Sequence, residues 1–252
     1  MRSLPRLGCV GYLNAKPLIY GWPGQVQFDH PSRLCRDLAN GELDVALVSS
    51  FEFLRNPIYS IIDEISIASD GPVYSVIVAH REPLEVVAEI AIDPASETSV
   101  NLLRALLAER GLTPQLVCEK ASDSSRARLL IGDQAIRFRE EHNDFAYWDL
   151  GDEWRHFCQR PFVYALWLIR PEFCSPREIA GELRAVRDRN LGRIDELIAN
   201  EQRFDQRFCA RYYRDHLRFT FGEREKEGLR TFQGLCARHQ LLAGPQPQLT
   251  LV

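Results

Sequence analysis

Short apolar segments alternate with amphipathic stretches along the first third of the chain. Residues 7–10, 26–28 and 44–48 have the length of strands, and the last of them is almost continuously apolar, as in a buried parallel strand. Residues 31–41 place apolar side chains on one face at helical spacing and end at a glycine. The pattern predicts a β–α–β unit with right-handed crossovers.

The same alternation begins again in the middle third. Residues 73–79, 89–92 and 128–131 are rich in valine, isoleucine and leucine and are predicted to be strands. Residues 100–109 form an amphipathic helix pattern, and residues 162–169 form a long apolar strand. The remaining third is predicted to be helical, with one helix over residues 175–200 and others over 207–219 and 223–238.

Two β–α–β units connected by two crossings predict an α/β fold with two lobes. Each lobe is expected to be a mixed sheet flanked by helices, and we assign residues 1–80 and 164–252 to the first lobe and 81–163 to the second. In such folds a ligand binds in the cleft between the lobes, where strands end and helices begin.

Composition narrows the classes of function. Hydrophobic residues make up 45 % of the 252-residue chain and the net charge is −4, so a nucleic-acid partner is not expected. The seven cysteines are an odd number with no C-x-x-C pair, which indicates neither a disulfide framework nor a metal site and fits a reducing cytoplasm. No apolar run approaches the ~20 residues of a membrane span, and no secretory signal is recognisable. A soluble, cytoplasmic protein with no membrane association is therefore expected.

Polar residues gather at four points where a strand is followed by a helix or turn. Asn14 stands where a helix cap is expected, and Lys16 next to it adds a positive charge. Free backbone N–H groups at such points, together with hydroxyl or amide side chains, favour the binding of carboxylates. Asp133 follows a strand and could serve as an acid, a base or a turn residue, of which we favour the turn residue. The candidate residues are Tyr12 and Asn14, Ser49 and Ser50, Ser69, Asp70 and Gly71, and Thr98 and Ser99.

Five motifs occur in the order typical of one enzyme family. They are Gly11-Tyr-Leu-Asn-Ala-Lys-Pro-Leu18, Gly41-Glu-Leu-Asp-Val-Ala-Leu-Val48, Ser66-Ile-Ala-Ser-Asp-Gly-Pro-Val73, Leu130-Ile-Gly-Asp133, and Asp149-Leu-Gly-Asp-Glu-Trp154 with Pro161-Phe-Val163. In this combination the chain resembles the chorismate dehydratases of the futalosine route to menaquinone, from about residue 7 to about residue 170. The resemblance implies a type II periplasmic-binding-protein fold and a reaction without a cofactor, in which chorismate loses water to give 3-[(1-carboxyvinyl)oxy]benzoate.

The resemblance also suggests roles for the candidate residues. Asn14 is expected to polarise or orient the reacting ring, and Ser69 with the Asp70-Gly71 backbone to hold a carboxylate or assist the departing hydroxyl. Thr98 and Ser99 are expected to bind the other carboxylate. No histidine or glutamate in a motif stands out as a base, so the enolpyruvyl carboxylate of chorismate itself is a candidate.

Two other functions are compatible with the sequence. One is the related dihydroxynaphthoate synthase of the same pathway, and the other is a non-catalytic solute-binding protein for a small carboxylate. The sequence leaves open the oligomeric state, the lobe that binds each carboxylate, and whether Tyr12 stacks on the substrate ring or lies in the core.

Overall fold

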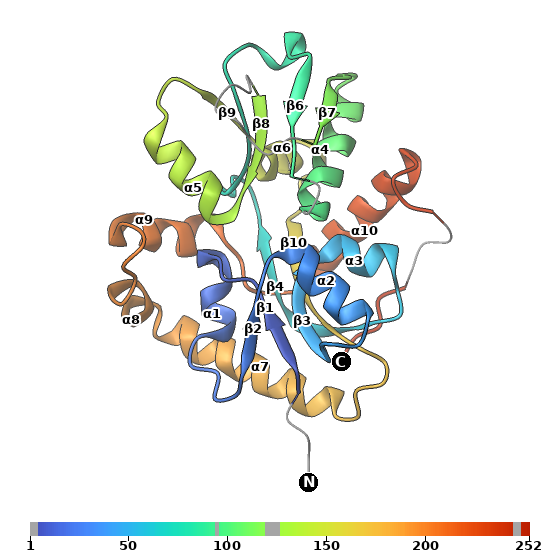
Figure 1. Cartoon of the computed structure of the whole chain (residues 1–252), viewed down its shortest axis with the longest axis vertical. Helices are drawn as coiled ribbons and strands as arrows, with labels where there is room; N and C mark the ends of the chain where they lie inside the picture. Colours follow the sequence, from blue (N-terminus) through green and yellow to red (C-terminus); the bar gives the residue numbers. More distant parts are fainter. Residues whose placement is uncertain (1–4, 94–95, 119–126, 244–247) are drawn as a thin grey trace.

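The computed structural model describes residues 5–93, 96–118, 127–243 and 248–252, which form two lobes, each built on one sheet (Figure 1). The first sheet has five strands, of which the first three in spatial order are parallel and β10 runs antiparallel to its neighbours β3 and β4. Its spatial order is β2 (Val26–Phe28), β1 (Leu7–Cys9), β3 (Val45–Ser49), β10 (Phe162–Ile169) and β4 (Ser60–Ser69).

The second sheet is also mixed. Strands β7, β6 and β8 are parallel, and β5 is antiparallel to both of its neighbours. The spatial order is β7 (Gln115–Val117), β6 (Glu89–Ala91), β8 (Ala127–Ile131), β5 (Val76–His80) and β9 (Ala146–Asp149). Both lobes are therefore mixed sheets, as predicted.

Helices flank both sheets, and α7 runs along the base of the first lobe in Figure 1. The helices that precede the second lobe are α1 (Lys16–Ile19), α2 (Pro31–Ala39) and α3 (Ser50–Arg55). The second lobe contains α4 (Glu97–Glu109) and α5 (Gly132–Glu141), and α6 (Leu150–Cys158) leads back to the first. The C-terminal part contains α7 (Pro176–Gly192), α8 (Ile194–Ala199), α9 (Gln206–Arg211), a π-helical turn (Tyr212–His216) and α10 (Glu223–Arg238). Short 3-10 turns span Leu13–Ala15 (η1) and Leu84–Val86 (η2).

The chain passes between the lobes at two places, and these differ from the predicted boundaries. The first crossing, residues 70–75, precedes β5. This strand hydrogen-bonds in the second sheet, although residues up to 80 were predicted to belong to the first lobe. The second crossing runs through α6 to β10, whose first residue Phe162 already pairs with Ser69 of the first sheet. The apolar pattern of a buried strand identifies the strand but does not say which sheet it joins.

Two helix predictions also need correction. The segment predicted as one helix over residues 175–200 is interrupted at Arg193, where the backbone leaves helical geometry (φ −123°, ψ 34°). The segment 207–219 ends in the π-helical turn instead of continuing as an α-helix. Among the described residues, no helix is long and apolar enough to cross a membrane.

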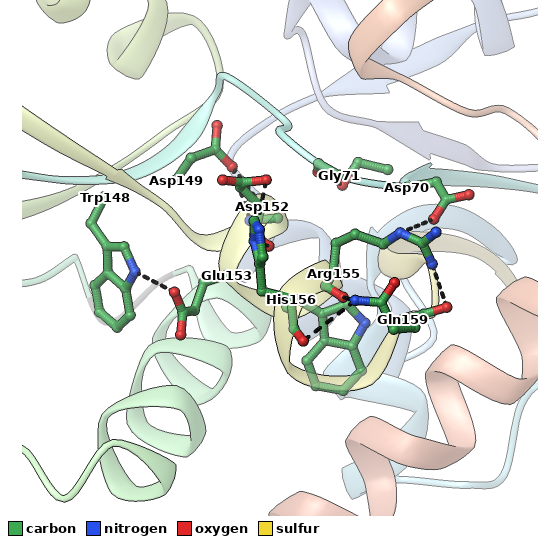
Figure 2. Close-up of polar contacts among 12 residues, drawn as sticks. Asp70, Gly71, Trp148, Asp149, Asp152, Glu153, Arg155, His156 and Gln159 are labelled. Atoms are coloured by element: carbon green, nitrogen blue, oxygen red, sulfur yellow. Dashed lines mark hydrogen bonds and ion pairs between the residues drawn. The ribbon is translucent and has the colours of Figure 1, made fainter.

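One half-buried carboxylate joins the two crossings. The Asp149 side chain caps α6 by accepting the backbone N–H groups of Gly151 at 3.0 Å and Asp152 at 3.2 Å. It also accepts the N–H groups of Val73 at 3.0 Å and Tyr74 at 2.7 Å in the first crossing. Figure 2 shows Asp149 at the start of α6, beside the strand that leads from the first lobe. These four hydrogen bonds tie the two crossings to each other.

Candidate active site

A cleft between the lobes encloses the largest group of candidate residues. It contains about 630 Å³ of space not filled by atoms, its open mouth included. Its wall in the first lobe is mostly apolar and includes Val10, Leu47, Val48 and Ile67. The polar side chains of the lining come from both lobes: Tyr12, Asn14, Ser49, Ser75, Ser96, Glu97, Thr98, Ser99 and Tyr164.

Hydroxyl groups from the two lobes meet at one end of this cleft. Ser49 ends β3 in the first lobe, and its Oγ is hydrogen-bonded to Oγ1 of Thr98 in the first turn of α4 in the second lobe. The Phe51 backbone N–H donates to the same Thr98 Oγ1 at 3.2 Å. Ser99 follows in the same helical turn and lines the cleft. Because the N-terminus of the 13-residue α4 carries free N–H groups and partial positive charge, this end of the cleft suits an anionic group.

Asn14 lies within η1 and faces the cleft. The cap of η1 is Tyr12, which has extended backbone geometry, and Asn14 makes no capping hydrogen bond, so its predicted capping role is wrong. Within the part of the chain that the structure describes, the buried Oδ1 of Asn14 has no hydrogen-bond partner. A buried acceptor without a partner is uncommon, and a donor supplied by a ligand would satisfy it.

Lys16 and Tyr12 take different positions near this turn. The Lys16 ammonium binds Glu201 at 2.9 Å and does not line the cleft, so it adds no free charge to it. Tyr12 is half-buried and packs against Gly132 of the second lobe, where a Cβ atom would lie only 3.0 Å from the Tyr12 ring. Gly132 has φ +56° as well, a conformation that favours glycine. The Tyr12 ring therefore lies at the boundary between the lobes and lines the cleft.

Four candidate residues do not line the cleft. Ser50 donates its hydroxyl to the Val163 carbonyl at 2.7 Å. Ser69 donates to the Gly71 carbonyl at 3.0 Å, and Gly71 has φ +126°, a conformation that favours glycine. Asp70 is directed toward Arg155, with which it forms an ion pair, as Figure 2 shows. Its carboxylate also pairs with Arg218 and Arg224, at 3.6 and 2.9 Å.

Tyr164 and Ser75 line the cleft although the sequence pattern did not indicate them. Tyr164 lies in β10, and its hydroxyl is hydrogen-bonded at 3.0 Å to Ser69, which therefore reaches the cleft only through this tyrosine. Burial raises the pKa of Tyr164 well above its ordinary value, so the phenol remains protonated at neutral pH. Ser75 accepts a hydrogen bond from Tyr212 at 2.6 Å. Both residues lie in segments whose apolar pattern indicates only burial. The one available signal was the motif from Ser66 to Val73, which ends just before Ser75 and contains Ser69, the partner of Tyr164.

Among the described residues that line the cleft, Glu97 is the one with a charged side chain. Its carboxylate pairs with Arg55 at 2.5 Å, and Arg55 also binds Glu52. Cys35, Glu52 and Glu97 approach one another closely enough to hold a metal ion. Because Arg55 already compensates both carboxylates, this cluster does not require a cation. The lining thus offers neutral donors and helix ends to an anionic ligand.

Comparisons with known proteins show what the chain is similar to as a whole. A family model described as menaquinone biosynthesis matches residues 5–238. The chain is 29 % identical to a chorismate dehydratase from Thermus thermophilus, covering 90 % of this chain and 93 % of that protein. It is 25 % identical to a chorismate dehydratase from Campylobacter jejuni, covering 89 % of this chain and 90 % of the relative.

Among solved structures, the periplasmic aliphatic sulphonate binding protein SsuA from Escherichia coli has a similar fold. Its TM-score is 0.66 at 13 % identity, over 98 % of this chain and 96 % of that one. The two-lobed periplasmic-binding-protein fold expected from the motifs is therefore confirmed. The match of the family model over nearly the whole chain shows that this protein belongs to the menaquinone biosynthesis family.

Proposed function

We propose that this protein is a chorismate dehydratase, a lyase that converts chorismate to 3-[(1-carboxyvinyl)oxy]benzoate and water without a cofactor. The two relatives with that name support the assignment. The observation that carries it is the cleft itself, which is lined by neutral hydroxyl groups, by the N-terminus of α4 and by Asn14, whose amide oxygen has no partner among the described residues. Chorismate has two carboxylates and a ring hydroxyl, which match these groups in chemical type.

The reaction removes a proton from ring carbon C3 and the hydroxyl group from C4. The electrons of the broken C3–H bond enter the ring as the C4–O bond breaks, and the hydroxyl leaves as water with the proton that the base has taken from C3. Charge develops on the ring carboxylate during deprotonation, so donors directed at that group stabilise the transition state more than the ground state. We place the ring carboxylate at Thr98 and Ser99, where α4 begins.

Asn14 is proposed to orient the reacting ring from the opposite side of the cleft. Its Oδ1 has no partner among the described residues and would accept a hydrogen bond from the C4 hydroxyl, which fixes the orientation of that group. The base is proposed to be the enolpyruvyl carboxylate of the substrate, so that positioning is the main contribution of the protein.

Ser69 is proposed to act through Tyr164. The Tyr164 hydroxyl lines the cleft and is hydrogen-bonded to Ser69, which in turn donates to the Gly71 carbonyl. This chain of hydrogen bonds holds the phenol beside the substrate. Asp70 supports this chain of hydrogen bonds indirectly, because its ion pairs with three arginines anchor the turn that contains Ser69 and Gly71.

Incubation of the purified protein with chorismate, followed by chromatography and mass measurement, tests the assignment. Formation of a product smaller by one water, faster than in a sample without protein, is the expected result. Saturable binding of chorismate without turnover would instead favour a solute-binding protein, the function named for the SsuA neighbour. If the protein neither converts nor binds chorismate, the later dihydroxynaphthoate synthase reaction becomes the better candidate.

A cytoplasmic location is part of the proposal. All seven cysteines are free thiols, as expected in a reducing compartment.

A further inference from the structure

Asp133 connects the second lobe to the turn that carries Asn14. It lies in the first turn of α5, and its Oδ1 accepts the backbone N–H of Leu13 in the first lobe at 2.7 Å. Leu13 directly precedes Asn14 in η1. The interpretation of Asp133 as a turn residue was therefore wrong, since it begins a helix and makes a contact between lobes.

The second oxygen of Asp133 has its own partner. Oδ2 binds the guanidinium group of Arg203 at 3.0 Å, and Arg203 also binds Glu201 at 3.2 Å. The Asp133 side chain is 16 % exposed, so its hydrogen bond to Leu13 is largely shielded from water. Shielding makes a hydrogen bond to a charged acceptor stronger than it would be at the surface.

The carbonyl side of the same turn is held separately. The Tyr213 hydroxyl donates to the Leu13 carbonyl at 3.0 Å, and both groups are buried. Tyr213 of the C-terminal segment thus holds the Leu13 carbonyl, whereas Asp133 of the second lobe holds the Leu13 N–H. Because Asp133 lies on the other lobe, its bond to Leu13 forms only when the lobes are close together.

We infer that Asp133 is a positioning residue that couples closure of the cleft to the placement of Asn14. Closure brings the carboxylate to the Leu13 N–H, and this contact orders η1 with the Asn14 amide directed at the substrate. The inference rests on the proposed function for its catalytic consequence, but the ordering of η1 is measurable without any substrate. A catalytic group misplaced by about 1 Å can cost about a hundredfold in rate.

Four variants and one control test this inference. Asp133→Ala removes the acceptor, and Asp133→Ser replaces the carboxylate with a hydroxyl one bond shorter, away from the Leu13 N–H. Serine is compatible with the start of a helix if the alanine variant does not fold. Asp133→Asn keeps an oxygen that can accept from Leu13, and Arg203→Ala removes the ion pair but leaves that hydrogen bond. Asp144→Ala is the control, because Asp144 pairs with Arg81 at the surface of the same lobe.

The first readout is hydrogen–deuterium exchange of the segment containing Leu13 and Asn14. Exchange is expected to become at least about tenfold faster in Asp133→Ser and to stay near the wild-type rate in Asp133→Asn and Asp144→Ala. Unchanged exchange in Asp133→Ser would overturn the inference, whether or not the protein acts on chorismate.

The second readout is steady-state turnover of chorismate. We expect kcat to fall about ten- to a hundredfold in Asp133→Ala and Asp133→Ser, with a smaller change in KM, and to remain within about threefold of wild type in Asp133→Asn and Arg203→Ala. Equal losses in the serine and asparagine variants would overturn the positioning role. An inactive wild-type protein would refute the proposed function alone, and the exchange experiment would still decide the role of Asp133.

Discussion

Replacing Asp149 with alanine should loosen both connections between the lobes at once. The Asp149 carboxylate accepts two N–H groups of the first crossing, from Val73 and Tyr74, and two from the start of α6. Alanine removes all four bonds from a position where little water can replace them. The relative placement of the lobes depends on these crossings, so the variant tests how the hinge is held.

The size of the effect follows from the groups left without partners. Loss of a helix cap costs about 1 kcal/mol, and each buried N–H without an acceptor costs about 1 to 3 kcal/mol. Burial raises the pKa of Asp149 and the four N–H groups oppose that rise, so the charge itself carries a cost that alanine removes. We therefore expect a loss near the lower end, about 3 kcal/mol in the free energy of unfolding. For a chain of 252 residues this corresponds to a decrease in Tm of about 6 to 12 °C.

Urea unfolding followed by circular dichroism measures this loss, and Asp149→Asn refines it. The asparagine oxygen can replace Oδ1, which accepts from Val73, Gly151 and Asp152, whereas its NH₂ group would face the Tyr74 N–H donor. The asparagine variant should therefore lose about 1 to 2 kcal/mol.

Asp152→Ala, in the exposed part of the same helical turn, is the matched control and should lose less than about 1 kcal/mol. A loss below about 1 kcal/mol in Asp149→Ala, or equal losses in the alanine and asparagine variants, would refute the reasoning.

Three further changes address the cleft and its surroundings. Asn14→Ala should lower kcat for chorismate about a hundredfold, and turnover within about threefold of wild type would exclude its proposed role. Thr98→Val keeps the shape of the side chain but removes the hydroxyl that meets Ser49, and should raise KM about tenfold; an unchanged KM would place the carboxylate elsewhere. Burial opposes ionisation of Glu201, but Lys16 and neighbouring donors lower its pKa to about 2. Because a lowered pKa stabilises the fold above the ordinary value of 4.5, the stability advantage of the wild type over Glu201→Gln should be complete above about pH 5 and disappear toward pH 2. Urea unfolding across this pH range tests it, and a constant difference would contradict the assigned pKa.

Much of the architecture was predictable from local pattern. The strand at residues 45–49 and the helix after it follow from an apolar run that ends in two serines. The spacing of apolar residues and the polar residues that interrupt it specify local structure. Ser49, Thr98 and Asn14 were identified as site residues for a related reason. In a sheet with parallel strands, strand ends and helix starts converge on one edge, and polar residues there face the cleft.

Other features were decided only by the tertiary structure. The pattern of β5 is that of any buried strand, and its membership in the second sheet depends on pairing with β8 and β9, which are distant in sequence. Asp70 and Ser69 are neighbours in one turn, yet Asp70 turns outward to three arginines and Ser69 inward to Tyr164.

The sequence by itself therefore determined most of the elements, their order and the edge of the sheet where the cleft lies. The folded chain decided which side chains line that cleft, as with Tyr164, which comes from a strand whose sequence pattern is simply apolar. It also gave Asp133 a partner in the opposite lobe, 120 residues away. The physical reason is that the side-chain periodicity of a helix or a strand is set by the local backbone, within a few residues. The direction and partner of a polar side chain depend instead on groups that packing brings together.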